Sequence, residues 1–222
     1  MIIDFHIHTH HSYDSLMKPE KIIKIAKKKG LTGIVVCDHN TIKGGLEVQK
    51  INRDKNFQVI VGAEIATNVG DITGIFLTKE IQSRNFETVV EEIKKQNGLV
   101  ILNHPYKAHQ LDKIDFSKID FIEGYNSRLN KELNQKAVAL AKKYNKPIIA
   151  GSDAHLYSEI GKCKTYLNNF SDRKITKTDY SPSSQFAVMI SQFIKAYKKK
   201  NFKTFVSAVI VTIKYYLSLK SE

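Results

Sequence analysis

The sequence lacks several features that mark common protein classes. It has only two cysteines, Cys37 and Cys163, which lie far apart and form no Cys-x-x-Cys pair. The sequence therefore indicates neither a disulfide framework nor a thiolate zinc site, and it favours a reducing compartment. Histidines interrupt the N-terminal segment before an apolar signal core can form. We accordingly predict a cytoplasmic protein.

Nucleotide-binding glycine motifs are also missing. Neither Gly-x-Gly-x-x-Gly nor Gly-x-x-x-x-Gly-Lys-Ser/Thr occurs, which disfavours a Rossmann domain and a P-loop. Acidic residues are outnumbered 22 to 35 by Lys and Arg, so the net charge is +13. This surplus is compatible with phosphate-bearing partners, short nucleic acid or an anionic membrane surface. Charge alone specifies no partner, and solvated lysines on helix surfaces are the simpler interpretation.

Short apolar runs alternate with helical patterns along most of the chain. The runs are 2–7, 33–37, 57–62, 72–77, 99–103, 120–124 and 147–151, and the helical patterns are 19–29, 46–53, 86–96 and 128–144. Runs rich in Ile and Val without alternation are typical of strands buried on both faces. The alternation predicts an α/β fold with a parallel sheet, and the seven-fold repeat favours a (β/α)7 barrel.

Side chains that can bind metals stand at the ends of most predicted strands. His6 and His8 share one face at the end of the first run, because side chains alternate along a strand. Asp38 and His39 follow the second run, Glu64 the third, His104 the fifth, Asn126 the sixth, and Asp153 and His155 the seventh, while Asp71 stands beside the fourth. The carboxyl ends of barrel strands open onto one face, so we expect a single metal site there.

Each of these residues has an ordinary alternative role. Glu64 could form a buried ion pair, Asp153 could cap a helix, and Asn126 could stabilise a turn. We expect His10 and His11 to be loop residues, because their neighbours already supply enough donors. His109 lies in a polar loop and is expected at the surface.

Five segments together resemble the polymerase and histidinol phosphatase (PHP) superfamily of metal-dependent phosphoesterases. They are Asp4-x-His6-x-His8-Thr9-x-x-Ser12-x-Asp14, Asp38-His39-Asn40-Thr41, Gly62-x-Glu64, Asn103-His104-Pro105 and Ser152-Asp153-x-His155. They span residues 1 to about 165 in the family's order. The resemblance implies a distorted seven-stranded barrel that holds two or three divalent ions, variously zinc, manganese or iron.

The resemblance also implies how the ligands are shared. One ion would lie between His6, His8, Glu64 and Asp153, a second between Glu64, His104 and Asp71, and a third between Asp14, His39 and His155. Many relatives carry a histidine shortly after the position of Glu64, where this chain has Gly70-Asp71. Aspartate is a harder ligand than imidazole and changes the charge of the site.

The implied activity is hydrolysis of phosphate esters by a metal-bound hydroxide, with His6, His8, Glu64, His104, Asp153 and His155 as the catalytic set. We expect Asp4 and Asp38 to orient the ligand rings. Arg128, Lys43 and Asn126 are the expected contacts to substrate phosphate, with Arg128 preferred because its guanidinium matches phosphate geometry. Lys107 is interpreted as a solvated loop charge.

Two alternatives to a phosphoesterase of small molecules, nucleotides or nucleoside bisphosphates stay open. One is a 5′–3′ exonuclease on short RNA or DNA, which the resemblance permits. The other is a non-catalytic PHP scaffold, which the nearly complete ligand set disfavours.

Residues 1–170 are predicted to form the PHP domain, and 171–222 a basic, apolar helical extension. In the extension, apolar residues recur at helical spacing, and a second apolar segment runs over 202–219. Its longest uncharged stretch, 204–213, is shorter than the roughly 20 residues that span a bilayer. We expect this extension to pack against the barrel or a partner subunit, with binding to a membrane surface as the alternative.

Overall fold

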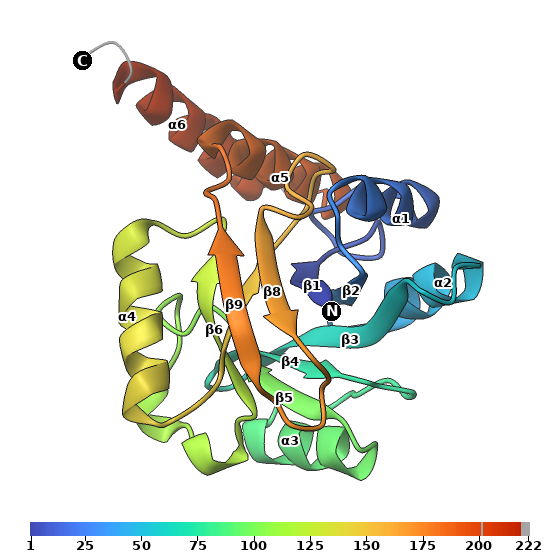
Figure 1. The fold of residues 1–222 in the computed structure, drawn as a ribbon. Coiled ribbons are helices and arrows are strands. Elements are labelled where there is room, and N and C mark those ends of the chain that lie inside the picture. Colours follow the sequence, from blue (N-terminus) through green and yellow to red (C-terminus); the bar gives the residue numbers. More distant parts are fainter. Residues whose placement is uncertain (201, 219–222) are drawn as a thin grey trace.

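A curved nine-stranded sheet with helices around it forms the body of the protein (Figure 1). The computed structural model describes residues 1–200 and 202–218. The strands are β1 (Ile2–Ile7), β2 (Gly33–His39), β3 (Gln58–Thr67), β4 (Gly70–Ile75), β5 (Leu99–Leu102), β6 (Phe121–Asn126), β7 (Ile148–Gly151), β8 (Cys163–Leu167) and β9 (Ile175–Tyr180). The helices are α1 (Pro19–Lys28), α2 (Lys43–Ile51), α3 (Phe86–Lys95), α4 (Lys131–Lys143), α5 (Gln185–Lys198) and α6 (Phe202–Ser218), with short 3-10 turns at Leu111–Lys113 and Phe116–Lys118.

The strand order is β7-β6-β5-β4-β3-β2-β1-β8-β9. Strands β1 to β3 are parallel to one another, and so are β5 to β7. The segment after β7 returns to β1, because Ala154 hydrogen-bonds with the backbones of His6 and His8 at 3.0 and 2.9 Å. The sheet is therefore a nearly closed barrel, which confirms the predicted fold class.

Strand β4 is the departure from a fully parallel barrel. It pairs antiparallel with both β3 and β5. Its first residues consequently lie at the rim where the parallel strands end, and Asp71 stands opposite Ala66 on β3. Strands β8 and β9, which lack long apolar runs and were not predicted, extend the sheet antiparallel beside β1.

Strand alternation divides the core into an inner and an outer layer. Val35 and Cys37 of β2 pack inside the barrel with Phe5 and Phe121. Their neighbours on β2 point outward, where Ile34 packs with apolar side chains of α1 and α2. All seven predicted strands and the four predicted helices are present, with shifted ends. Helix α4, for example, begins at 131 rather than 128, because the Asn130 side chain caps it by accepting from the Leu133 amide.

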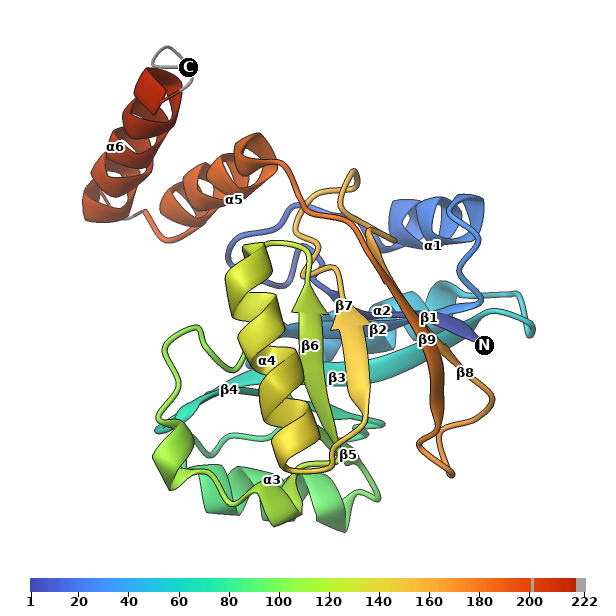
Figure 2. The same cartoon turned by 60° about the vertical axis from the view of Figure 1, so that its left-hand side comes forward.

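The last two helices project from the barrel as a pair (Figure 2). The Ser184 hydroxyl caps α5 by accepting from the Ala187 amide. Helix α6 lies against α5 and exposes Phe205, Ile210 and Ile213. No helix within 1–200 and 202–218 is long and apolar enough to cross a membrane.

The predicted division at residue 170 stays a prediction, as does an association of the helical pair with a membrane or a second subunit. Strand β9 lies beyond residue 170 and still belongs to the same sheet. The predicted apolar segment extends to Leu219, which lies outside the described residues.

Candidate metal centre

Two histidines at the end of β1 and two carboxylates from other strands surround one point. The Nε2 atoms of His6 and His8 are 3.1 Å apart. Glu64 Oε2, from β3, lies 3.6 Å from both nitrogens. Asp153 Oδ1, just after β7, lies 3.6 and 3.3 Å from them. All four side chains are buried, and they come from three strand ends of one barrel rim.

The spacing of these four donor atoms fits a divalent ion. Zinc binds imidazole nitrogen and carboxylate oxygen at about 2.0–2.2 Å, which places two tetrahedral ligands about 3.4 Å apart. The separations of 3.1–3.6 Å lie on both sides of that value. Mixed imidazole and carboxylate donors suit zinc, manganese or iron. The donor set thus could hold such an ion.

The protonation pattern of the two rings supports the same conclusion. His6 Nδ1 faces Glu123 Oε1 at 2.9 Å, so Nδ1 carries the proton of a neutral ring. His8 Nδ1 donates to Ser12 Oγ, at 3.0 Å, because the Ser12 hydroxyl itself donates to Asp38 Oδ1. Both Nε2 lone pairs therefore point at each other across 3.1 Å. Such an arrangement needs a cation, either a proton or a metal, between the two nitrogens.

A second donor group shares Glu64. The other carboxylate oxygen of Glu64, Oε1, lies 2.9 Å from His104 Nε2. Asp71 completes this group, since one ligand atom from each of the three residues lies within 4.8 Å of the others. The reversal of β4 explains how Asp71 reaches the rim. His104 Nδ1 is buried and finds no hydrogen-bond partner in the described part of the chain.

A third donor group joins Asp14 with two histidines. Asp14 Oδ2 lies 3.2 Å from His39 Nε2, and Asp14 Oδ1 lies 3.2 Å from His155 Nε2. His155 Nδ1 donates to the Asp153 carbonyl, so Nε2 of the neutral ring offers a lone pair to the Asp14 oxygen. That oxygen accepts no hydrogen bond from any described residue. His155 Nε2 and Asp14 Oδ1 are therefore two acceptors that face each other, an arrangement that favours a cation between them.

Electrostatic coupling sets the protonation states of the donors in the metal-free protein. Burial, together with the neighbouring His155 and His39, lowers the pKa of His8 to about 3. Its ring is thus neutral. Burial alone would raise the pKa of Glu64, but His39 and His6 outweigh burial and lower this pKa well below its ordinary value. Burial opposes charge on His39 too, yet Glu64 and Asp14 raise its pKa to about 10.

Two candidate ligands have strained backbones. His104 has φ +25° and Asp153 has φ +52°, in the left-handed region that residues other than glycine rarely adopt. Such strain persists only where surrounding contacts enforce it, and it is common at functional sites. For His104, the backbone amide donates to Glu123 Oε2 at 2.9 Å. For Asp153, Asn126 Nδ2 lies 3.3 Å from Oδ2 and fixes the carboxylate.

The carboxylates predicted to orient ligand rings, Asp4 and Asp38, accept from backbone amides and side-chain hydroxyls around the site. Within the described residues neither contacts an imidazole ring directly, but Asp38 holds the Ser12 hydroxyl that faces His8 Nδ1. Asp38 accepts from the amide and hydroxyl of Thr9 and from Ser12. A Cβ at Gly44 would lie 1.9 Å from Asp38 Oδ2, so this approach of α2 requires glycine. Asp4 accepts from the amides of His6, Ser152 and Gly161 and from the Ser152 hydroxyl.

The side chain that orients His6 is Glu123, which sequence reasoning missed. Its Oε2 also accepts from Asn126 Nδ2, at 3.0 Å. The signal was a single acidic residue inside the apolar run Phe121-Ile122-Glu123. Asn103, also missed, donates to Glu64 Oε1 at 3.1 Å. Glu123 thus holds His6, and Asn103 holds Glu64, by hydrogen bonds that orient these candidate metal ligands.

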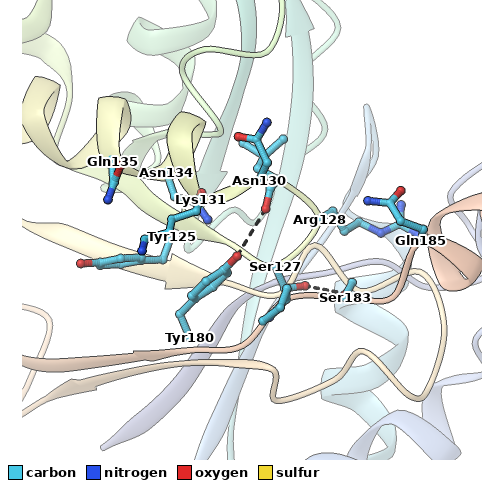
Figure 3. A pocket seen from close by; sticks show the side chains of 12 residues that line it. Tyr125, Ser127, Arg128, Asn130, Lys131, Asn134, Gln135, Tyr180, Ser183 and Gln185 are labelled. Carbon is cyan, nitrogen blue, oxygen red and sulfur yellow. Dashed lines mark hydrogen bonds between the residues drawn. The ribbon is translucent and has the colours of Figure 1, made fainter. Parts of the chain in front are cut away.

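Arg128, the expected phosphate contact, forms an ion pair with Glu159 and a hydrogen bond with Ser191. Its Nε lies 2.9 Å from Glu159 Oε1, and its Nη2 lies 2.9 Å from Ser191 Oγ on α5. Arg128 is 8 % exposed and Glu159 is fully buried. Arg128 lines a cavity of ≈ 540 Å³ together with Tyr125 and Tyr180. Figure 3 shows the side chains of these residues. This corrects the expectation that Arg128 is free to bind phosphate. Asn126 is likewise buried and bonded to Glu123 and Asp153.

Lys107 is a cation whose charge is coupled to the donors. Its side chain is exposed on the loop after β5. Desolvation of the ammonium opposes its charge, but Asp153 and Glu64 raise the pKa of Lys107 above its ordinary value. Lys43 is exposed at the start of α2, and its role as a phosphate contact stays a prediction.

Of the remaining histidines, His109 differs from expectation, whereas His10 and His11 lie in a loop as expected. His109, expected at the surface, is half-buried; its Nε2 donates to the Asp71 carbonyl at 2.8 Å, and its ring centroid lies 5.8 Å from that of His104. His10 and His11 stay outside the three donor groups described above and lie next to Glu47.

Comparison with known proteins identifies a protein family whose model this chain matches. A model of the PHP domain matches residues 4–205. An uncharacterised protein of Methanocaldococcus jannaschii is 35% identical over 167 residues, which cover 63% of this chain and 98% of that protein. A 5′–3′ exoribonuclease of Haemophilus influenzae is 32% identical over 65 residues only, 29% of this chain and 23% of that enzyme.

A solved structure supports the fold. A two-domain protein of Bacteroides vulgatus that contains a predicted PHP-like metal-dependent phosphoesterase superposes with a TM-score of 0.62 at 21% sequence identity. The match covers 74% of this chain and 57% of the other. Both chains therefore share the barrel that brings strand ends to one rim.

Proposed function

The chain belongs to the PHP domain family, and we propose that it is a metal-dependent hydrolase of phosphate esters. One observation carries the proposal: three groups of imidazole and carboxylate donors meet at one barrel rim. Glu64 belongs to the first two groups, and His8 of the first group also lies within reach of His39 and His155 of the third. Divalent ions held there would lower the pKa of a bound water and stabilise charge on the phosphoryl group.

The residues explain why an anionic substrate would enter. Glu64 places one carboxylate oxygen toward His6 and His8 and the other toward His104, so it can bridge two ion positions. Neutral imidazoles add no negative charge, so three divalent ions would outweigh the four carboxylates of the donor groups and leave the rim positive. Lys107, exposed on the loop that follows His104 and electrostatically coupled to Asp153 and Glu64, would hold a phosphoryl oxygen.

A second candidate is 5′–3′ exonuclease activity on short RNA or DNA. The partial similarity to the Haemophilus influenzae exoribonuclease and the net charge of +13 favour it. The chemistry at the donors would be the same, and only the leaving group would differ. The non-catalytic scaffold has less support, because the donor set implied by the family resemblance is complete here, with Asp71 in place of a histidine.

The test measures metal and activity together. Purified protein would be analysed for bound zinc, manganese and iron, then assayed with added Mn²⁺ on phosphomonoesters, nucleoside bisphosphates and 5′-phosphorylated oligonucleotides. We expect the His8→Ala, Asp153→Ala double variant to lose ions and at least about 10²-fold in rate. The matched control Asp172→Asn, in an exposed loop, should keep both. Unchanged metal content and activity in the double variant would refute the proposal.

A further inference from the structure

A fourth cluster of ligand-type side chains lies outside the metal centre, at the outer edge of the loop after β1. His10 and His11 project from this loop, and Glu47 reaches them from α2. His11 Nε2 lies 2.8 Å from Glu47 Oε2, and His10 Nε2 lies 3.7 Å from the same oxygen. The two ring centroids are 4.3 Å apart.

The spacing fits one zinc ion between the three side chains. Tetrahedral zinc places imidazole and carboxylate donors about 3.4 Å apart, and the two measured separations from Glu47 lie on either side of this value. One ligand atom from each residue lies within 4.8 Å of the others. Side-chain rotation, which half-exposed groups can make, would bring all three donor atoms to zinc-binding distances.

The backbone that carries these donors is held in place. The His10 amide donates to the Met17 carbonyl at 2.9 Å, and the His10 carbonyl accepts from Lys198 Nζ on α5 at 2.6 Å. The His11 amide donates to Thr9 Oγ1 at 3.1 Å. The close packing of Gly44 on Asp38 fixes the start of α2, the helix that carries Glu47. The donors are therefore presented on ordered segments.

Access and unsatisfied bonding also suit a bound ion. The side chains of His10, His11 and Glu47 are 40%, 28% and 41% exposed, so water can complete the coordination. A cavity of ≈ 510 Å³ opens beside them and is lined by His10, Leu16, Lys18, Pro19, Glu20 and Glu47. His10 Nδ1 finds no hydrogen-bond partner among the described residues, so no contact at that nitrogen competes with rotation of the ring.

We propose that His10, His11 and Glu47 form an additional zinc site, separate from the metal centre. Two imidazoles and one carboxylate favour zinc over magnesium or calcium, which prefer all-oxygen sites. His8, two residues earlier, points into the barrel and contributes to the inner centre instead. The outer site is open and half-exposed, so it exchanges its ion with solvent more readily than the buried centre does.

The experiment counts zinc ions per full-length chain by equilibrium dialysis. Glu47→Gln and the double variant His10→Gln, His11→Gln should each bind one zinc ion fewer than the wild type. Glu20→Gln, which changes a non-donor carboxylate lining the same cavity, should bind the wild-type number. Equal stoichiometry in the wild type and both site variants would overturn the site, and so would a loss in the histidine variant alone. Circular dichroism verifies that every variant is folded.

The outer site can be tested apart from the proposed function. In the His8→Ala, Asp153→Ala background, which lacks two donors of the inner centre, at least one zinc ion should remain, and adding Glu47→Gln should lower the count by one. Cobalt(II) bound in this background should show the visible absorption of a four- or five-coordinate ion. An inner centre that proves inactive would not alter these counts. A background variant that binds no zinc or cobalt would overturn the outer site.

Discussion

Glu123 Oε1 lies 2.9 Å from Nδ1 of His6, and both groups are buried. The contact fixes which nitrogen of His6 is free to bind a metal, and it makes that nitrogen more basic. We predict that Glu123→Gln lowers metal affinity about 10–100-fold, because the amide offers a weaker acceptor or a repelling donor to Nδ1. Competition with a chelator measures this affinity.

The matched control for that prediction is Glu132→Gln. Glu132 is exposed on α4 and pairs only with Lys136 in the described structure. The metal affinity of Glu132→Gln should therefore equal that of the wild type. If Glu123→Gln binds metal as tightly as Glu132→Gln, Glu123 does not set the state of His6.

Metal binding should release protons. The neighbouring carboxylates outweigh burial and hold the pKa of His6 well above its ordinary value, and they raise that of His39 to about 10. Both rings are therefore protonated in the metal-free protein at pH 7, and an ion must displace those protons. Affinity should rise with pH between about pH 6 and pH 8, by about tenfold per unit for each proton released.

Calorimetry in buffers of different ionisation enthalpy counts these protons. We expect at least one per chain at pH 7, and a smaller number in His39→Gln. A binding heat that is independent of the buffer, with a flat affinity across this range, would contradict the assigned protonation of the metal-free donors.

Lys107→Ala should weaken substrate binding without removing metal. A lost charge-assisted hydrogen bond costs about 1.5–3 kcal/mol, so KM for a phosphomonoester should rise about tenfold or more. Lys113→Ala, an exposed lysine of the same loop region, is the matched control and should leave KM unchanged. Equal KM values in the two variants would exclude Lys107 as a phosphate contact.

Much of the fold was predictable because its causes are local. Runs such as Ile34-Val35-Val36 are typical of strands buried on both faces, and alternation with helices then favours a barrel. Barrel geometry alone brings His6, Glu64 and His104 to one rim. The reversal of β4 was not predictable, because its apolar pattern is the same in either direction.

The supporting contacts were less predictable, because they depend on tertiary placement. Arg128 was predicted to contact phosphate because its guanidinium matches phosphate geometry, but its partner is Glu159, 31 residues away in sequence. Glu47 meets His11 across 36 residues, on a helix whose register no motif specifies. Sequence spacing therefore indicates which residues follow strands. The carboxylates that pair with Arg128 and His11 are instead determined by how distant segments pack.

The ion pair between Arg128 and Glu159 gives a prediction about stability rather than catalysis. Arg128→Met would leave the buried Glu159 carboxylate without its cation, although the amides of His155 and Leu156 still donate to it. Removing one partner of such a pair costs about 3–5 kcal/mol. Urea denaturation should show that loss, and Arg128→Met combined with Glu159→Gln should recover part of it, because the orphaned charge is gone. KM of any folded Arg128→Met protein should stay near the wild-type value. A variant of unchanged stability that loses substrate affinity would instead restore Arg128 as a phosphate contact.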